Sequence, residues 1–245
     1  MTGPILLTGG SGRLGQELRQ LMPDLIAPPR QELDITQPET LTACLARYRP
    51  AGLIHAAAYT NVAQAETDRD LCWQVNVQGT RHLVQATQHL GIPLIHISTD
   101  YVFAGERGNY REGDMPGPPL NYYALTKLVA EEVVRVHPHP LIIRTSFRPR
   151  TWPYPVAFTD VFTSQDYVDV IAPDIALAIQ HWADIPDDTL HIATERKSVY
   201  ELAQRRCPTV QPGSRSQARV PLPADSSLDC TRWQTLKQAW SLAHA

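Results

Sequence analysis

The sequence is poor in cysteine, in excess charge and in long apolar runs. Its 245 residues include four scattered cysteines with no CxxC pair, so we expect no disulfide framework, no metal site and a reducing, cytoplasmic setting. The net charge of −3 offers no basic surface for nucleic acid. No apolar run reaches the roughly 20 residues that span a bilayer, and the N-terminus lacks the features of a signal peptide. We therefore expect neither nucleic acid nor membrane as a partner.

Short apolar runs alternate instead with segments of helical periodicity. Strands are expected at residues 4–8, 25–27, 53–58, 94–98, 141–145 and 190–193. Helices are expected at residues 12–22, 70–90, 122–136, 174–182, 199–206 and 228–242. A further helix is expected to run to about residue 47 from a capping box that starts at Thr36. This order is typical of βαβ units and predicts an α/β fold with a Rossmann-like, doubly wound parallel sheet.

A glycine-rich loop joins the first expected strand to the first expected helix. In it Gly9 would make the tight turn, Gly12 would let the backbone approach a pyrophosphate, and Gly15 would let helix and strand pack closely. The pyrophosphate would bind the free N–H groups of the helix N-terminus. Glycine also serves ordinary turns, but this position between strand and helix favours dinucleotide binding.

The end of the second expected strand bears on the choice of dinucleotide. It reads Ala27-Pro28-Pro29-Arg30, without the acidic residue that would bind the ribose of NAD. Arg30 and Arg13 are placed to bind a 2′-phosphate, so NADP(H) is favoured over NAD(H), although each is equally interpretable as a surface arginine. The expected cofactor-binding residues are Gly9, Ser11, Gly12, Arg13, Leu14, Gly15, Arg30, Asp34, Ile35, Ala56, Ala57, Ala58, Tyr123 and Lys127.

Tyr123 and Lys127 are the candidate catalytic pair. They are four residues apart in an expected helix, which places both side chains on one face. A neighbouring ammonium lowers the pKa of a phenol, so Tyr123 is expected to exchange a proton near neutral pH. Thr99 adds a hydroxyl at the end of an apolar run, where α/β folds bind ligands. Taken alone, the Tyr/Lys pair is better explained as a chance feature of a helix surface, but together with Thr99 and the glycine loop it favours catalysis.

Several segments together resemble a known family. They are residues 8–15, 33–36, 56–60, 76–80, 98–103 and the Tyr123/Lys127 pair, with weaker likeness at 144–146 and 226–229. The chain resembles an extended short-chain dehydrogenase/reductase, and within that group the dTDP-4-dehydrorhamnose reductase branch. The resemblance is dense to about residue 146. Residues 1–146 are therefore expected to form an NAD(P)-binding Rossmann domain, and residues 147–245 a reduced substrate-binding portion interleaved with it.

The resemblance implies reduction of a keto group on a nucleotide-activated deoxysugar, by a monomer or homodimer. Tyr123 would donate the proton, Lys127 would lower the pKa of Tyr123 and hold the nicotinamide ribose, and Thr99 would hydrogen-bond the carbonyl oxygen. The expected substrate contacts are Tyr101, Phe103, Asn121 and Phe147.

The chain also departs from the family pattern. His55 stands where Asn is usual, Phe147 stands where Trp is frequent, and the segment after Ser146 is short and proline-rich. Two alternatives stay open: an NADP-binding regulatory subunit resembling that of methionine adenosyltransferase, and a nucleotide-sugar epimerase. Sugar-nucleotide 4,6-dehydratases of the same fold carry an Asp-Glu pair after the active-site Thr, and the Glu moves a ring proton. Here Asp100 is followed by Tyr101, so the resemblance implies that the base of a dehydratase is missing.

Overall fold

The core of the fold is a five-stranded parallel sheet, seen in a computed structural model that describes residues 3–218 and 220–243. Its strands, in spatial order, are β1 (Ile5–Thr8), β2 (Gly52–His55), β3 (Leu94–Thr99), β4 (Pro140–Thr145) and β9 (Thr189–His191). The strand expected at residues 25–27 is reduced to one parallel bridge, between Ile26 and Leu6 at the outer edge of β1.

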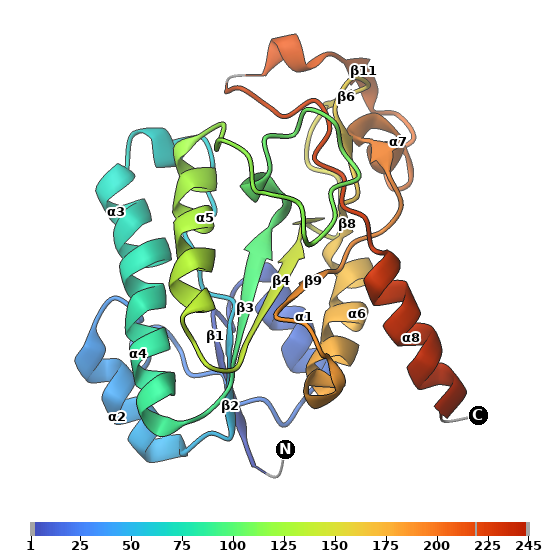
Figure 1. The fold of residues 1–245 in the computed structure, drawn as a ribbon. Coiled ribbons are helices and arrows are strands. Elements are labelled where there is room, and N and C mark those ends of the chain that lie inside the picture. The colour runs from blue at the N-terminus through green and yellow to red at the C-terminus, as the bar shows by residue number, and fades with distance from the viewer. Residues whose placement is uncertain (1–2, 219, 244–245) are drawn as a thin grey trace.

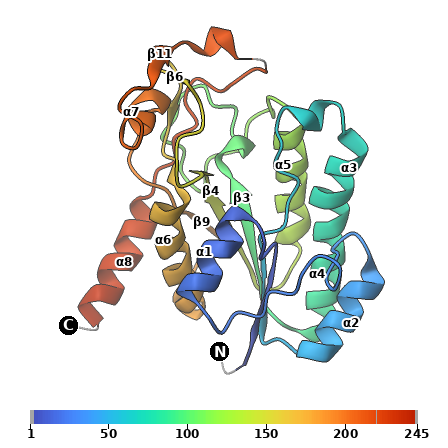
Figure 2. The ribbon, with the colours of Figure 1, turned by 180° about the vertical axis from the view of Figure 1, so that it is seen from behind.

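Helices cover both faces of the sheet (Figures 1 and 2). One face carries α2 (Pro38–Tyr48), α4 (Thr80–Leu90) and α5 (Tyr122–Arg135). The other carries α1 (Arg13–Leu21) and α6 (Val168–Gln180), with α8 (Thr231–Ala243) beside α6. The predicted doubly wound α/β fold is confirmed.

Adjacent residues of β1, β2, β3 and β4 supply two separate cores. In β1, Leu6 packs in the core on the α2 and α4 side, whereas Leu7 packs in the core on the α1 and α6 side. Leu94 and Ile95 of β3 divide in the same way. Successive strand side chains point to opposite faces, and a parallel sheet buried on both faces therefore needs these uninterrupted apolar runs.

Several expected boundaries shift. The expected capping box is wrong: Gln37 precedes the helix, Pro38 opens it, and the Thr36 hydroxyl donates to Asp34 Oδ1 at 2.7 Å instead. The helix expected at 70–90 is divided into α3 (Arg69–Trp73), a π-helical turn (Gln74–Gly79) and α4. The helix expected from residue 174 begins at Val168 and contains Pro173, because buried Ile171 and Ala172 extend its apolar face.

Residues after β4 contribute to two regions. β9 joins the main sheet and α6 covers one of its faces. The remaining short elements lie together beyond the carboxyl ends of β3 and β4 (Figure 1). They are β5 (Phe147–Arg148) paired with β8 (Asp166–Tyr167), β6 (Val156–Phe158) with β11 (Gln211–Gly213), β7 (Phe162–Thr163) with β10 (Lys197–Ser198), and α7 (Val199–Gln204).

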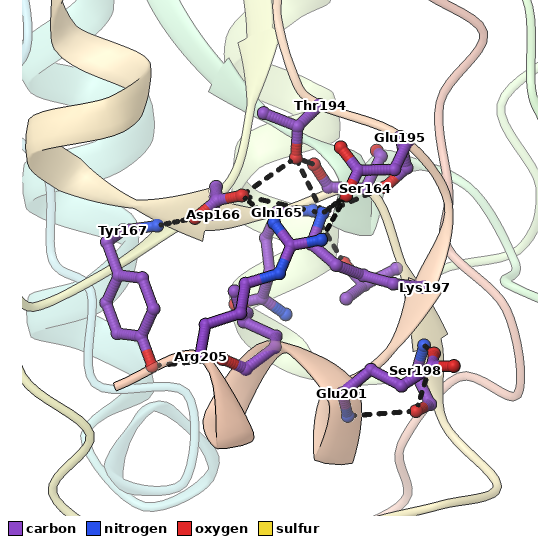
Figure 3. Close-up of polar contacts among 12 residues, drawn as sticks. Ser164, Gln165, Asp166, Tyr167, Thr194, Glu195, Lys197, Ser198, Glu201 and Arg205 are labelled. Atoms are coloured by element: carbon purple, nitrogen blue, oxygen red, sulfur yellow. Dashed lines mark hydrogen bonds and ion pairs between the residues drawn. The ribbon is translucent and has the colours of Figure 1, made fainter. Parts of the chain in front are cut away.

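A network of paired charges holds this smaller region together (Figure 3). The buried Lys197 ammonium donates to Thr194 Oγ1 at 2.6 Å and to the Glu195 carbonyl oxygen at 2.9 Å. Arg205 donates to Asp166 Oδ2 at 2.9 Å and also pairs with Glu195. Lys197 also lies 3.6 Å from buried Asp166 Oδ2, so the buried charges are paired and the network joins β8, β10 and the end of α7.

Candidate active site

The glycine loop lies where β1 and β2 end side by side, at the point where the sheet connections reverse direction. Gly9 has φ +73°, and a Cβ there would lie 2.6 Å from the Ala57 nitrogen. A Cβ on Gly15 would lie 2.2 Å from the Gly9 carbonyl oxygen. Both positions therefore require glycine.

The N-terminus of α1 is open to an anion. Gly12 precedes the helix without a side-chain cap, and the first turn contains no acidic residue. The free N–H groups of this turn attract negative charge through the helix dipole. Ser11 and Arg13 are exposed beside them, whereas Leu14 is buried in the core. These residues fit a dinucleotide pyrophosphate.

The residues expected around the adenosine end form their own contacts. Arg30 Nε donates to Asp34 Oδ2 at 3.1 Å, and Asp34 Oδ1 accepts from the backbone nitrogen and hydroxyl of Thr36. Partial burial raises the pKa of Asp34, but the hydrogen bonds from Thr36 and Arg30 and the Arg30 charge outweigh it and hold that pKa below its ordinary value. Ile35 is buried against Gly79. Ala56, Ala57 and Ala58 are half-buried just beyond β2.

Thr99 at the end of β3 and Tyr123 in the first turn of α5 share a side-chain hydrogen bond, and Lys127 lies one turn further along α5. Lys127 is buried, and its ammonium donates to the Ile97 carbonyl oxygen at 2.8 Å and to His96 Nε2 at 3.1 Å. Burial lowers the pKa of Lys127 to about 8, although the Glu131 carboxylate opposes the shift. Burial and then the Lys127 charge also hold the pKa of His96 well below its ordinary value, so the imidazole is a neutral acceptor.

Tyr123 is a neutral phenol in this environment. Burial, reinforced by the Asp100 carboxylate, raises its pKa above the ordinary value, while a hydrogen bond with the Thr99 side chain opposes the rise. The prediction that Lys127 lowers the pKa of Tyr123 is wrong for this geometry. The i, i+4 spacing is present, but the Lys127 ammonium is held against β3 by Ile97 and His96.

Asp100 and Tyr101 continue the site beyond Thr99. Burial raises the pKa of Asp100 to about 6, and its carboxylate accepts from Ser226 Oγ at 2.8 Å and from Thr99 Oγ1 at 3.1 Å. The Tyr101 ring lies edge-on to that of Tyr123, with centroids 6.3 Å apart. Asp100 is thus a buried hydrogen-bonding residue, and the Tyr101 ring contacts the Tyr123 ring.

Comparison with known proteins now decides the family. A family model described as the RmlD substrate binding domain matches residues 1–148. The chain belongs to the RmlD family.

Curated proteins and solved structures both contain relatives of this chain. A dTDP-4-dehydrorhamnose reductase of Streptomyces griseus is 42% identical over 134 residues, covering 53% of this chain and 44% of the relative. One from Aggregatibacter actinomycetemcomitans is 36% identical, covering 58% and 51%. The chain thus spans about half the length of the curated relatives it matches. The solved dTDP-4-dehydrorhamnose reductase of Bacillus anthracis in complex with NADP has a TM-score of 0.86 at 28% identity, covering 96% of this chain and 93% of that one.

Only one of the four expected substrate contacts, Tyr101, is shown beside the Tyr123 ring. Phe103 is buried and stacks on Tyr110 with centroids 4.3 Å apart. Asn121 caps α5, its Oδ1 accepting from the Ala124 nitrogen at 2.9 Å, and its buried Nδ2 has no partner. Phe147 packs against the core beneath α1 and α6.

His55, the departure from the RmlD pattern, is a buried structural residue. Its Nδ1 lies 3.0 Å from Thr8 Oγ1 and its Nε2 lies 3.0 Å from Thr80 Oγ1. The ring also lies 5.0 Å from that of His96. It therefore ties β1, β2 and α4 together beneath the loop.

Two residues that position the site were not identified from the sequence. His96 binds Lys127, and buried Glu131 pairs with Arg144 at 2.8 Å while accepting from the Ser98 hydroxyl. Glu131 thereby fixes α5 against β3 and β4. The available signal was a polar residue within an apolar pattern: His96 interrupts a buried strand, and Glu131 follows Lys127 by one helical turn.

Within residues 3–218 and 220–243, no group of three or more His, Cys, Asp or Glu side chains is arranged to hold a metal ion. No helix of that same portion is long and apolar enough to cross a membrane.

Proposed function

We propose that this chain is an NADPH-dependent reductase of a nucleotide-activated 4-keto deoxysugar. The observation that carries the proposal is the side-chain hydrogen bond between Thr99 and Tyr123, with Lys127 one turn further along α5, in a member of the RmlD family that also carries the glycine loop before α1. The reductase names of the matched relatives and the NADP of the solved neighbour support the same reaction. The four free cysteines fit a cytoplasmic setting.

Each residue of the triad has a distinct part in this proposal. The glycine loop would hold NADPH, which would supply the hydride when bound. Tyr123 is protonated at neutral pH, because burial raises its pKa, and donates its hydroxyl proton to the ketone oxygen. Thr99 hydrogen-bonds the same oxygen and orients it. Lys127 binds the nicotinamide ribose through the ammonium N–H that His96 and Ile97 leave free.

The cofactor site is proposed from the residues that surround the loop. Gly9, Gly12 and Gly15 let the backbone approach the pyrophosphate, and the first turn of α1 supplies its N–H donors. Arg13 and Arg30 bind the 2′-phosphate of NADPH, with Asp34 orienting the Arg30 guanidinium.

One feature favours a second function, an NADP-binding regulatory subunit. The Lys127 ammonium is bonded to His96 and Ile97 and does not lower the pKa of Tyr123. A chain that kept the cofactor site without an activated tyrosine would bind NADPH and leave it unchanged.

One experiment separates the two functions. Purified protein is mixed with NADPH and, separately, with dTDP-, GDP-, UDP- and CDP-4-keto-6-deoxysugars while nicotinamide absorbance is followed. The reductase predicts oxidation with at least one sugar and its loss in Tyr123→Phe. Tight NADPH binding without oxidation by any of them would reject the reductase in favour of the binding subunit.

A further inference from the structure

Arg148 is a half-buried arginine without a counterion. Its Nε is buried and has no hydrogen-bond partner, and its guanidinium forms no ion pair within the described part of the chain. Its neighbours in sequence are paired: Arg144 with Glu131 at 2.8 Å, and Arg150 with Glu17 at 2.7 Å. Removing a charged group from water without a partner costs free energy, so the site is suited to an anion supplied from outside.

Trp152 adds a second unsatisfied donor beside it. The Arg148 guanidinium lies over the Trp152 ring, 5.5 Å from the centroid. The indole Nε1 is buried and lacks a partner, like Arg148 Nε. Indole N–H and guanidinium groups only donate hydrogen bonds, so the pair requires an acceptor. Stacking on the ring restricts the arginine and reduces the entropy lost when it binds.

The strand that carries Arg148 directs it toward the reacting residues. The Ser146 side chain hydrogen-bonds Asp100, and Phe147 packs into the core. Arg148 follows Phe147 in β5, two residues beyond Ser146. Burial raises the pKa values of Asp100 and Tyr101, and the Arg148 charge opposes both shifts, so the guanidinium acts on both groups. Tyr101 in turn adjoins Tyr123.

We propose that Arg148 and Trp152 together bind an anionic oxygen group of the substrate beside Tyr101. This rests on the proposed function and assigns a specificity-determining pair to it. The anion is either the diphosphate of the nucleotide or a carboxylate on the sugar, since both present oxygen acceptors to a guanidinium fork.

Calorimetric titration of the NADP⁺-saturated protein tests the pair without turnover. The probes are dTDP, UDP, UDP-glucose and UDP-glucuronic acid. Arg148→Met keeps the aliphatic stem, Arg148→Lys keeps the charge, and Trp152→Phe keeps the ring without its N–H. Arg81→Met, on the exposed side of α4, is the matched control.

The expected result is a loss of affinity of about ten- to a hundredfold in Arg148→Met, smaller losses in Arg148→Lys and Trp152→Phe, and none in Arg81→Met. Losses for every nucleotide that binds identify the diphosphate, whereas a loss confined to UDP-glucuronic acid identifies the carboxylate. Unchanged affinity, no binding of any probe by the wild type, or a loss of NADP⁺ binding instead would overturn the proposal. Binding without NADPH oxidation would reject the reductase and leave the anion site standing.

Discussion

The Lys127 ammonium donates a hydrogen bond to Nε2 of His96 across 3.1 Å, inside the sheet–helix interface. Because an ammonium can only donate, His96 Nε2 is the acceptor. The other ring nitrogen, Nδ1, is buried without a partner, so Lys127 is the side chain that the imidazole binds. The second contact of the ammonium, to the Ile97 carbonyl oxygen, is a main-chain bond that side-chain substitution leaves in place. His96 is therefore the side chain that determines where the Lys127 ammonium lies.

His96→Leu removes one of the two bonds that hold the ammonium against β3, and we expect the ammonium to move toward Tyr123 while it keeps its bond to the Ile97 carbonyl oxygen. As a positioning residue, His96 should affect kcat and the pH profile of the reaction more than the affinity for NADPH. A nearer ammonium lowers the pKa of Tyr123. We therefore expect kcat to rise about tenfold and the basic limb of the pH profile to move to lower pH. Steady-state kinetics from pH 6 to 10 measures both, and His139→Leu, at an exposed position just before β4, is the control. A variant with lower stability but an unmoved profile would contradict this role.

Lys127 is expected to make stability depend on pH. Its folded-state pKa of about 8 lies below the ordinary value of 10.5, so the folded protein binds fewer protons than the unfolded chain between these values. Unfolding free energy should therefore rise with pH in this window, by about 1 kcal/mol per pH unit at most. Urea denaturation of wild type and Lys127→Met from pH 7 to 10 tests this, because the variant should lack the rise. Parallel curves would show that Lys127 titrates normally.

Tyr123→Phe removes the proposed proton donor and little else. We expect turnover to fall by about a hundred- to ten-thousandfold, as for loss of a general acid, with NADPH affinity retained. Fluorescence titration of NADPH and single-turnover absorbance measure the two quantities. Tyr122→Phe is the adjacent control, since that ring lies under Arg69. Equal activity in both variants would remove Tyr123 from the mechanism.

Arg30→Met should weaken NADPH binding about tenfold and leave NADH binding unchanged, because only NADPH carries the 2′-phosphate. Arg47→Met is closely matched: Arg30–Asp34 and Arg47–Glu32 are both 3.1 Å pairs, with arginine side chains 69% and 67% exposed. The control should affect neither cofactor. Equal losses for NADPH and NADH would place Arg30 away from the phosphate.

Gly15→Ala should abolish dinucleotide binding and lower the free energy of unfolding by about 1–3 kcal/mol. The added Cβ would lie 2.2 Å from the Gly9 carbonyl oxygen, so loop and helix must separate. Gly113→Ala has no atom within 4 Å of the added Cβ and should be neutral in both assays. NADPH titration and thermal unfolding give the comparison, and retained binding in Gly15→Ala would show that the loop tolerates the change.

Much of the fold was predictable because its signals are local. The strands β1, β3 and β4 are short buried runs, and α1 and α5 follow with helical periodicity, so element type and order could be inferred. The Thr36 cap could not be inferred, because the Asp34 carboxylate competes for the Thr36 hydroxyl. The lost strand near Ile26 is likewise a question of tertiary pairing, since only one bridge to Leu6 forms.

Spacing alone determined that Tyr123 and Lys127 share a helix face and that a glycine loop joins β1 to α1. The tertiary structure decided what those residues can do. Burial and Asp100 raise the pKa of Tyr123, while His96 and Ile97 hold the Lys127 ammonium against β3. Packing also leaves the buried Nε of Arg148 without a hydrogen-bond partner and places Phe103 in the core. Proton affinities and unpaired charges depend on desolvation and on distant neighbours, which only the folded chain brings together.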